Sequence, residues 1–415
     1  MSLSQPAVPA ATAADDRYAK LSVAAAVFFA MLIAGYAVVS AGPITLNPPR
    51  DFDGYAFGRD FVNVWMGGRA ALAGGPAAWF DFATYNEALR AVFGADFPPH
   101  YWSYPPHLLL FTWPFGLLPY LPAYMLWCVA GIALYVAAAA DGDFRRERVL
   151  FLAAAPGVAI CAFFGQNGFY TAAILIAGLT QLERRPLLAG VLFGLLTIKP
   201  QLGLMLPVML IVTGRWRTIG AAAVTALALF AATSALYGVD IWTAYLDKVT
   251  PQQNWLLVNA SGLLLAMVAS AFEAARMIGL PVTAAWIIQG FVSVASIAAV
   301  IWTFWQRRDP ALSTALLVTA TFLATPWALT YDLVVLGWVV DLLRRRADND
   351  VNDHRLLVAV WTLPVTMLLA GAIHIPLAFA VLALFTGRLI WRLAGAPAPV
   401  PGAEARKYPG PLADS

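Results

Sequence analysis

The sequence predicts an all-α integral membrane protein, a bundle of many spanning helices with one long loop outside the membrane. Three observations support this prediction. Of the 415 residues, 61% are hydrophobic and only 12% are charged, whereas soluble domains carry about 25% charged residues. Apolar runs recur along almost the whole chain, so most of its surface must face lipid. The one long polar stretch, at about 41–105, follows the first apolar run.

The chain divides into a membrane domain and two tails. Residues 1–20 and 394–415 are rich in Pro and Ala, and we expect both tails to be disordered. The membrane domain covers 21–393 and begins with an apolar run at 21–40. That run has spanning length, about 20 residues, and is too long for the apolar part of a signal peptide. We therefore expect it to be an uncleaved anchor.

Many shorter apolar runs follow, and prolines or glycines interrupt several of them. Because a straight span needs about 20 residues, we expect about ten to thirteen spans, some of them tilted, broken or re-entrant. The sequence leaves the path through 106–140 open. Two crossings there would place the basic stretch at 141–148 on the outer side, against the positive-inside rule.

Basic clusters set the predicted orientation. Those at 215–217, 307–308 and 344–346 should be cytoplasmic, because membrane proteins keep Lys and Arg on that side. The segment 256–272 must then be re-entrant or lie along the outer face. Polar segments from distant parts of the chain meet on that face, namely the first loop at 41–105, residues 165–167, Lys199-Pro200 and 326–332. A second outer loop at 238–255 could cover them from outside.

Composition and motifs exclude several kinds of site. The net charge is only +3 and the basic residues form short clusters, which gives no indication of nucleic-acid binding. Cys128 and Cys161 lie inside apolar stretches, where we expect buried reduced thiols, and no Cys or His spacing is typical of a metal site. The sequence contains no Gly-rich phosphate loop and no Ser-x-x-Lys or Gly-x-Ser-x-Gly nucleophile motif.

The stretch "FGRDFVNVWMGGRAALAGG" at 57–75 is charged, aromatic and helix-like. Asp60 stands where a helix at 60–73 would begin, so its carboxylate could cap the first turn. It could also be a carboxylate at the water–lipid boundary that deprotonates an acceptor hydroxyl, and one group could do both. Arg59 beside it would hold an anionic group or influence Asp60.

An aromatic cluster, "HYWSYPP" at 100–106, precedes a Pro-Pro entry into the membrane. Its rings suit an interfacial belt, and at that depth they also suit stacking on a sugar or an isoprenoid. Tyr104 is the substrate-binding candidate from this cluster. His100 and His107 flank it, and we expect them to be interfacial hydrogen-bonding residues rather than catalysts.

Lys199 lies between two apolar half-runs and is followed by a proline. A lysine left in the middle of a bilayer costs about 2.5–3.5 kcal/mol, so it should face a cavity or reach the interface. It either extends to the headgroups or binds a lipid phosphate. Gln166 and Asn167 in "FFGQNGFY" are too polar for a lipid-facing turn, and they could bind hydroxyl groups.

The stretch "TPWALTYDLVVLGWVV" begins with a proline break and places Asp332 inside an apolar helix. An ionisable group in that position is a candidate site residue, although a hydrogen bond between packed helices would also explain it. Tyr331 beside it could stack on a substrate or donate a hydrogen bond to it.

The order of these motifs resembles a known family. "GRDF", "YPP", "GQN", "IKP" followed by "RWR", and "TPWALTYDLVVL" occur in the order and spacing of the bacterial integral-membrane glycosyltransferases of family 87. That family includes polyprenol-phosphate-mannose-dependent mannosyltransferases. The similarity extends over about 50–345. It departs at Tyr331-Asp332, where the actinobacterial mannosyltransferases carry histidine, so the sugar and the acceptor stay open.

The resemblance implies a GT-C-type helix bundle with its active site at the outer, periplasmic face of the cytoplasmic (inner) membrane. The donor would be a polyprenyl-phosphate-linked sugar, such as mannose or another hexose, and the acceptor a lipid or a glycan. The transfer would be inverting, with the acidic residue of the first outer loop, here Asp60, as general base. Lys199 and Gln166 match polar positions near the donor phosphate. We expect no metal or other cofactor, although some GT-C enzymes use a divalent cation.

Two alternatives remain from the residues alone. A secondary transporter or lipid flippase would also be polytopic with ionisable groups inside the membrane, and it would be expected to show repeated halves. No repeat is evident in this chain. A structural or assembly membrane protein, whose polar residues merely extend to the headgroups, is the other alternative.

Overall fold

The computed structural model describes residues 17–18, 20–28, 31, 50–51, 53–259 and 261–395. Most of the predicted tails at 1–20 and 394–415, and most of the anchor run at 21–40, lie outside these residues, whereas residues 17–18, 20 and 394–395 are helical. In the described part nearly every element is a helix, and strand pairing is limited to two isolated bridges. The predicted all-α fold is confirmed.

The elements form an outer unit, two halves of a bundle and a connection between the halves. The outer unit consists of α2 (Phe61–Ala73), η1 (Pro76–Phe80), α3 (Phe82–Phe93), η2 (Pro106–Leu108) and α4 (Leu109–Gly116). The first half of the bundle comprises α5 (Tyr120–Ala140), α6 (Arg146–Ala153), α7 (Pro156–Phe164), α8 (Gly168–Gln181), α9 (Pro186–Leu195), η3 (Leu196–Ile198), η4 (Pro200–Gly203), α10 (Leu206–Val212) and α11 (Trp216–Tyr237).

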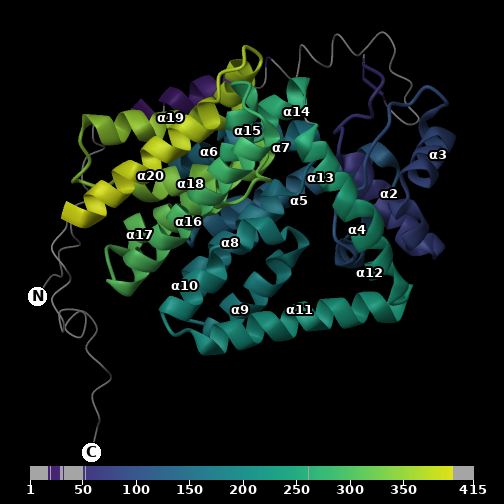
Figure 1. Ribbon diagram of the computed structural model, residues 1–415, viewed down its shortest axis with the longest axis horizontal. Helices are drawn as coiled ribbons and strands as arrows, with labels where there is room; N and C mark the ends of the chain where they lie inside the picture. Colours follow the sequence, from purple (N-terminus) through teal and green to yellow (C-terminus); the bar gives the residue numbers. More distant parts are fainter. Residues whose placement is uncertain are drawn as a thin grey trace, which may run out of the picture.

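The connection is made of short helices. It comprises α12 (Asp240–Ala244), the π-helical turn η5 (Tyr245–Val249), α13 (Thr250–Val258), α14 (Gly262–Met267) and α15 (Ala271–Met277). The second half of the bundle comprises α16 (Val282–Trp305), α17 (Pro310–Ala324), η6 (Thr330–Leu333), α18 (Val334–Arg344), α19 (Val351–Gly371) and α20 (Leu377–Gly395). Figure 1 shows α2, α3 and α4 together on one side, α16 to α20 on the other, and α5, α7 and α8 between them.

Five of the described helices, α5, α11, α16, α19 and α20, are long and apolar enough to cross a membrane, and α6 with α7 makes a sixth if this pair, bent by 48°, counts as one span. The chain is therefore a multi-pass membrane protein. Other apolar runs form shorter helices because prolines interrupt them, as at Pro200 and Pro326. These shorter helices explain why fewer full-length spans occur than the ten to thirteen expected. The segment 256–272 is divided among α13, α14 and α15, none of spanning length.

The structure settles the path through 106–140. Helix α4 has only 8 residues and packs on α2 of the outer unit. The two backbones lie so close that a Cβ placed on Gly68 would be 2.4 Å from the carbonyl oxygen of Thr112 and 2.7 Å from the nitrogen of Gly116. Helix α4 therefore belongs to the outer unit, and α5 alone crosses the bundle in this region.

One end of the bundle is tied together by ion pairs. Arg148 lies 2.6 Å from Asp341 near the end of α18, and Arg344 lies 3.0 Å from the same carboxylate. Arg388 of α20 lies 2.9 Å from Asp353 of α19. The stretch 141–148 thus lies at the same end as 344–346, which removes the conflict with the positive-inside rule that two crossings would have created.

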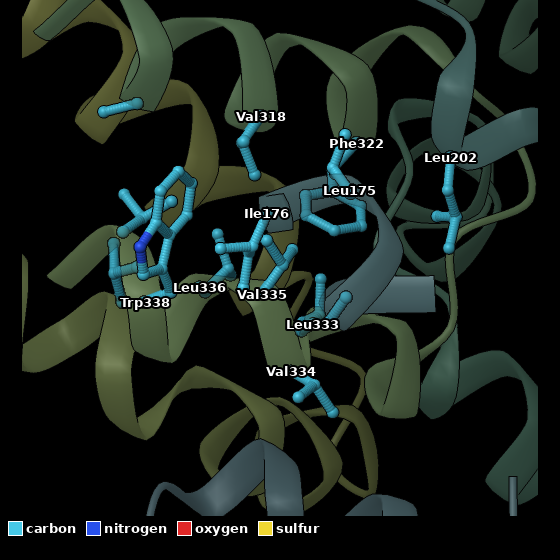
Figure 2. Close-up of a cluster of buried hydrophobic side chains, with 14 of the residues drawn as sticks. Leu175, Ile176, Leu202, Val318, Phe322, Leu333, Val334, Val335, Leu336 and Trp338 are labelled. Atoms are coloured by element: carbon cyan, nitrogen blue, oxygen red, sulfur yellow. The ribbon is translucent and has the colours of Figure 1, made fainter. Parts of the chain in front are cut away.

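The main hydrophobic core lies between α8, α17 and α18. Figure 2 shows aliphatic and aromatic side chains of one buried cluster, which come from these helices, from η6 and from η4, namely Leu175, Ile176, Leu202, Val318, Phe322, Leu333, Val334, Val335, Leu336 and Trp338. A second core of aromatic residues fills the outer unit and includes Phe61, Trp65, Tyr85 and Trp102. This second core fixes the start of α2, where Asp60 lies.

The close approach of α2 and α4 gives a stability prediction. Gly68→Ala should destabilise the protein by about 1–3 kcal/mol, because the added methyl group meets backbone atoms that cannot move aside. The thermal unfolding midpoint of the purified protein in detergent measures the change. Gly220→Ala in α11 is the matched control, because no atom outside its own helix lies within 4 Å of the new methyl group. Equal midpoints for the two variants would contradict the proposed packing of α4 on α2.

A buried carboxylate, Glu273, lies in α15, which is not a spanning helix. Glu273 is 1% exposed, and neither of its carboxylate oxygens has a hydrogen-bond partner among the described residues. Burial raises the pKa of Glu273 from about 4.5 to about 7, and the positive charge of Arg276 opposes this rise. The folded protein therefore binds a proton more tightly at this site than the unfolded chain does.

The free energy of unfolding should consequently fall as pH rises from about 4.5 to about 7, and this group should contribute about 3 kcal/mol to the fall. Above pH 7 its contribution should no longer change. Below pH 4.5 both states carry the proton, and above pH 7 neither does. Thermal midpoints of wild type and Glu273→Gln, compared at pH 5 and pH 8, measure the effect. The variant should lose this part of the pH dependence, and an unchanged difference between the two pH values would contradict the assignment.

Candidate active site

Four helix breaks surround one cavity of about 620 Å³. They are the start of α2, the turn between α7 and α8, the break between η3 and η4, and the segment that leads into η6. Each break supplies one predicted residue to the cavity lining: Asp60, Gln166, Lys199 and Tyr331. Tyr104, from the segment before η2, lines it as well. The expected convergence of distant polar segments thus occurs around a real cavity.

Asp60 is held at the start of α2 by its backbone, not by a capping side chain. Its N–H donates to the carbonyl of Phe164 at 3.0 Å, and its φ and ψ are −74° and −11°, which is already helical. The predicted side-chain cap is therefore wrong. The carboxylate turns toward the cavity, where Oδ2 accepts a hydrogen bond of 2.7 Å from Nε2 of Gln166. Oδ1 makes no hydrogen bond with any described residue and is left for a ligand.

Gln166 fixes the orientation of that carboxylate. Its Oε1 accepts a hydrogen bond of 2.8 Å from the hydroxyl of Tyr104. Burial and the nearby charge of Asp60 raise the pKa of Tyr104 well above its ordinary value, so the phenol keeps its proton and acts as the donor. The amide must then present Nε2 to Asp60, and the three side chains form one chain of hydrogen bonds.

Gly165 makes this arrangement sterically feasible. Its φ is +60°, and a Cβ on it would lie 2.5 Å from Cβ of Phe61 and 2.6 Å from the carbonyl oxygen of Gly58. Only a glycine lets the turn before Gln166 approach the start of α2 so closely.

Lys199 and Asp332 form a buried ion pair between Nζ and Oδ1, with side chains 8% and 0% exposed. The other oxygen of Asp332 accepts a hydrogen bond of 3.1 Å from the backbone N–H of Leu329. Nζ of Lys199 also lies 4.8 Å from the ring centre of Tyr331. Lys199 lines the cavity whereas Asp332 lies behind it. The pair therefore joins the broken end of α9 to the broken start of α18 and leaves a cation at the cavity surface.

Besides Asp332, two further predicted residues lie away from the cavity lining. Arg59 has φ +37° and lies 2.9 Å from Asp51, 2.8 Å from Asp53, and 4.8 Å from the ring centre of Tyr55. Its guanidinium thus holds the first loop together. Asn167 is 1% exposed, and neither its Oδ1 nor its Nδ2 has a hydrogen-bond partner among the described residues.

Sequence reasoning did not select several residues that line the cavity. His100 is one: its backbone is fixed by Asn86, whose Oδ1 accepts from the His100 N–H at 2.8 Å and whose Nδ2 donates to the His100 carbonyl at 2.9 Å. Burial lowers the pKa of His100, and the charge of Asp60 partly opposes this effect. The ring is therefore expected to be neutral at pH 7. Asn63 and Gln201 also line the cavity.

Helix α13 supplies a further set of lining residues. Thr250, Gln253, Asn254 and Leu257 all line the cavity, and their spacing places them on one helical face. Polar residues at a helical period within the second outer loop were the sequence signal that could have identified them.

A sequence model of glycosyltransferase family 87 matches residues 102–326, more than half of the chain. The chain belongs to glycosyltransferase family 87. The residues matched to the family 87 model include Tyr104, Gln166 and Lys199, whereas Asp60 precedes the match and Asp332 follows it. No curated protein and no solved structure gives a significant match.

Membership of family 87 makes the protein a membrane glycosyltransferase, which acts on a sugar donor and an acceptor. This favours the enzyme over the transporter and assembly-protein alternatives. Within the described ranges no group of three or more His, Cys, Asp or Glu side chains could hold a metal ion. The expectation of a cofactor-free reaction stays a prediction.

Proposed function

We propose that the protein moves a hexose such as mannose from a polyprenyl phosphate to a hydroxyl of a lipid or glycan acceptor, with inversion at the anomeric carbon. The observation that carries this proposal is a single cavity that presents a lysine ammonium and a carboxylate with one unoccupied oxygen. A sugar phosphate needs a cation for its leaving group, and a hydroxyl nucleophile needs a base.

The reaction would be one displacement. The acceptor oxygen bonds to the anomeric carbon while the bond from that carbon to the phosphate oxygen breaks. The hydroxyl proton goes to Oδ1 of Asp60, and the electron pair of the broken bond leaves with the phosphate. Lys199 would stabilise the negative charge on the phosphate. Asp332 would hold the ammonium in place, and Tyr331 would contact the donor beside it.

The hydrogen-bond chain gives the remaining candidates their roles. Gln166 and Tyr104 would position Asp60, because the hydrogen bond to Oδ2 leaves Oδ1 for the acceptor hydroxyl. Arg59 would act through the shape of the first loop, since its ion pairs tie Asp51 and Asp53 to the segment next to Asp60. Asn167 would support the turn that carries Gln166.

The distribution of charge supports a location for the cavity on the outer side of the membrane. The ion-paired basic end of the bundle lies beyond the C-terminal end of α18, and the cavity lies at its N-terminal end. Because Lys and Arg favour the cytoplasmic side, the cavity would open on the outer side of the cytoplasmic membrane. A lipid-linked donor suits that location, because nucleotide sugars are cytoplasmic metabolites.

The test of this function is a comparison of donors. Wild-type protein in lipid vesicles would receive either a radiolabelled polyprenyl-phosphate mannose or a labelled nucleotide sugar, together with a glycolipid acceptor fraction. We expect label in the acceptor only with the lipid-linked donor. Equal transfer from the nucleotide sugar would contradict the proposed donor class, and movement of the lipid across the membrane without any product would favour a flippase.

A further inference from the structure

The cavity has two chemically different walls. Around Asp60 the lining is polar and includes Tyr55, Asn63, His100, Ser103 and Gln166. Another part of the lining, which we call the apolar wall, consists of Leu256, Leu257, Leu264, Trp286, Pro326 and Trp327, of which Leu257 and Trp327 belong to one hydrophobic cluster. A ligand that fills the cavity therefore meets both hydrogen-bonding groups and an apolar surface.

Helix α13 shows the same change along its own length. Its cavity-lining residues are Thr250, then Gln253 and Asn254, and then Leu256 and Leu257. Leu264 of α14 continues the apolar part. A molecule lying along this helix would thus have its polar end near residues 250–254 and its apolar end near 257–264.

The apolar wall includes a partly exposed residue of a spanning helix. Trp286 belongs to the spanning helix α16 and is 38% exposed while also lining the cavity. Its ring packs on Phe272 of α15 with 4.5 Å between ring centres. Leu264 is half-buried. Trp286 therefore links the cavity lining to the exposed surface of a spanning helix.

Lys199 connects to the apolar wall through Tyr331 and Leu329. The ring of Tyr331 lies next to the Lys199 ammonium, and Leu329, two residues earlier, also lines the cavity. Leu329 pairs through its backbone with Val268, which directly follows α14. The wall is therefore continuous from the lysine to α14. Of the two substrates, the one with a phosphate next to a hydrocarbon chain fits the lysine end.

We propose that the apolar wall binds the isoprenoid chain of the donor, which leaves the cavity past Leu264 and Trp286, between α14 and α16. This inference rests on the proposed polyprenyl-phosphate donor. It assigns the polar side, with Gln253 and Asn254, to the acceptor.

The first test compares two donors that carry the same sugar phosphate, one on a long polyprenyl chain and one on a short water-soluble chain. Leu264→Asp should raise KM for the long-chain donor about tenfold or more, because a charged group replaces an apolar contact. KM for the short-chain donor should change less than about twofold, since that chain does not reach the wall. The matched control is Leu263→Asp, the adjacent residue of α14, which is 56% exposed and does not line the cavity.

Equal effects on both donors, or equal effects of the two variants, would overturn the assignment. So would a rise in KM for the acceptor alone, which would place an acceptor lipid on this wall. If wild type transferred sugar from neither donor, the proposed function would fail instead.

A second test needs neither turnover nor a variant. A polyprenyl phosphate with a photoreactive diazirine in its chain is added to wild-type protein in vesicles. The sample is irradiated, and the labelled peptides are identified by mass spectrometry. We expect label in α14 and around Trp286, displaced by excess unlabelled polyprenyl phosphate. Displaceable label only on other helices, such as α11 or α20, or the absence of displaceable label, would overturn the inference.

Discussion

Asp60→Asn should lower kcat for sugar transfer by about 10²–10⁴-fold, the range typical of a lost general base. The substituted amide keeps an oxygen that can accept the hydrogen bond from Gln166, and the backbone contact to Phe164 does not involve the side chain. The fold of the site and the affinity for the donor should therefore persist. Transfer rates in vesicles and equilibrium binding of a labelled polyprenyl phosphate measure the two effects separately.

The matched control is Asp96→Asn, in the same outer loop. That carboxylate pairs with Arg50 at 2.8 Å, its side chain is 79% exposed, and it does not line the cavity. It should transfer sugar at the wild-type rate. Full activity of Asp60→Asn would eliminate Asp60 as the base, and a loss of donor binding equal to the loss of rate would make Asp60 a binding residue.

Lys199→Met should both destabilise the protein and weaken donor binding. The methionine leaves the Asp332 carboxylate buried with one backbone partner and no cation. Removing one partner of a buried ion pair destabilises a protein by about 3–5 kcal/mol. The thermal unfolding midpoint should fall, and KM for the donor should rise because the phosphate loses its cation.

The double variant Lys199→Met/Asp332→Asn separates these two effects. It removes the buried charge while keeping an acceptor for the Leu329 N–H, so most of the lost stability should return. Donor KM should stay high, since no cation faces the cavity. If KM returned to the wild-type value together with stability, Lys199 would have a structural role alone.

The sequence predicted which polar side chains gather on one face of the bundle, because each of them stands out from the apolar sequence around it. Asp60, Gln166 and Lys199 each interrupt apolar sequence near a glycine or proline, and such polar groups must face a cavity or the membrane boundary. Orientation from the basic clusters then placed them on one face. The structure brings all three to the lining of one cavity.

The partners of these residues could not be predicted in the same way. The ion pair of Lys199 joins residues 133 positions apart, and Gln166 contacts Asp60 across 106 positions. The local sequence pattern around a residue does not show which distant polar side chain it will contact in the folded protein. Arg59 illustrates the opposite case, because it precedes Asp60 in sequence yet pairs with Asp51 and Asp53.

The path of the chain around α4 was also beyond local pattern. Its apolar composition suits a membrane crossing as well as a helix packed on the outer unit. The close contact of Gly68 with Gly116 decides between them, and that contact depends on tertiary packing. Likewise, 256–272 has the composition of a span but forms the short helices that border the cavity.

The most direct test of the central claim is the anomeric configuration of the sugar in the product, read by NMR after transfer from a polyprenyl-phosphate donor of known configuration. A single displacement in which Asp60 takes the proton of the acceptor hydroxyl predicts complete inversion. Retention would require a covalent sugar–enzyme intermediate or a front-face reaction, and it would contradict the assignment of Asp60 as general base.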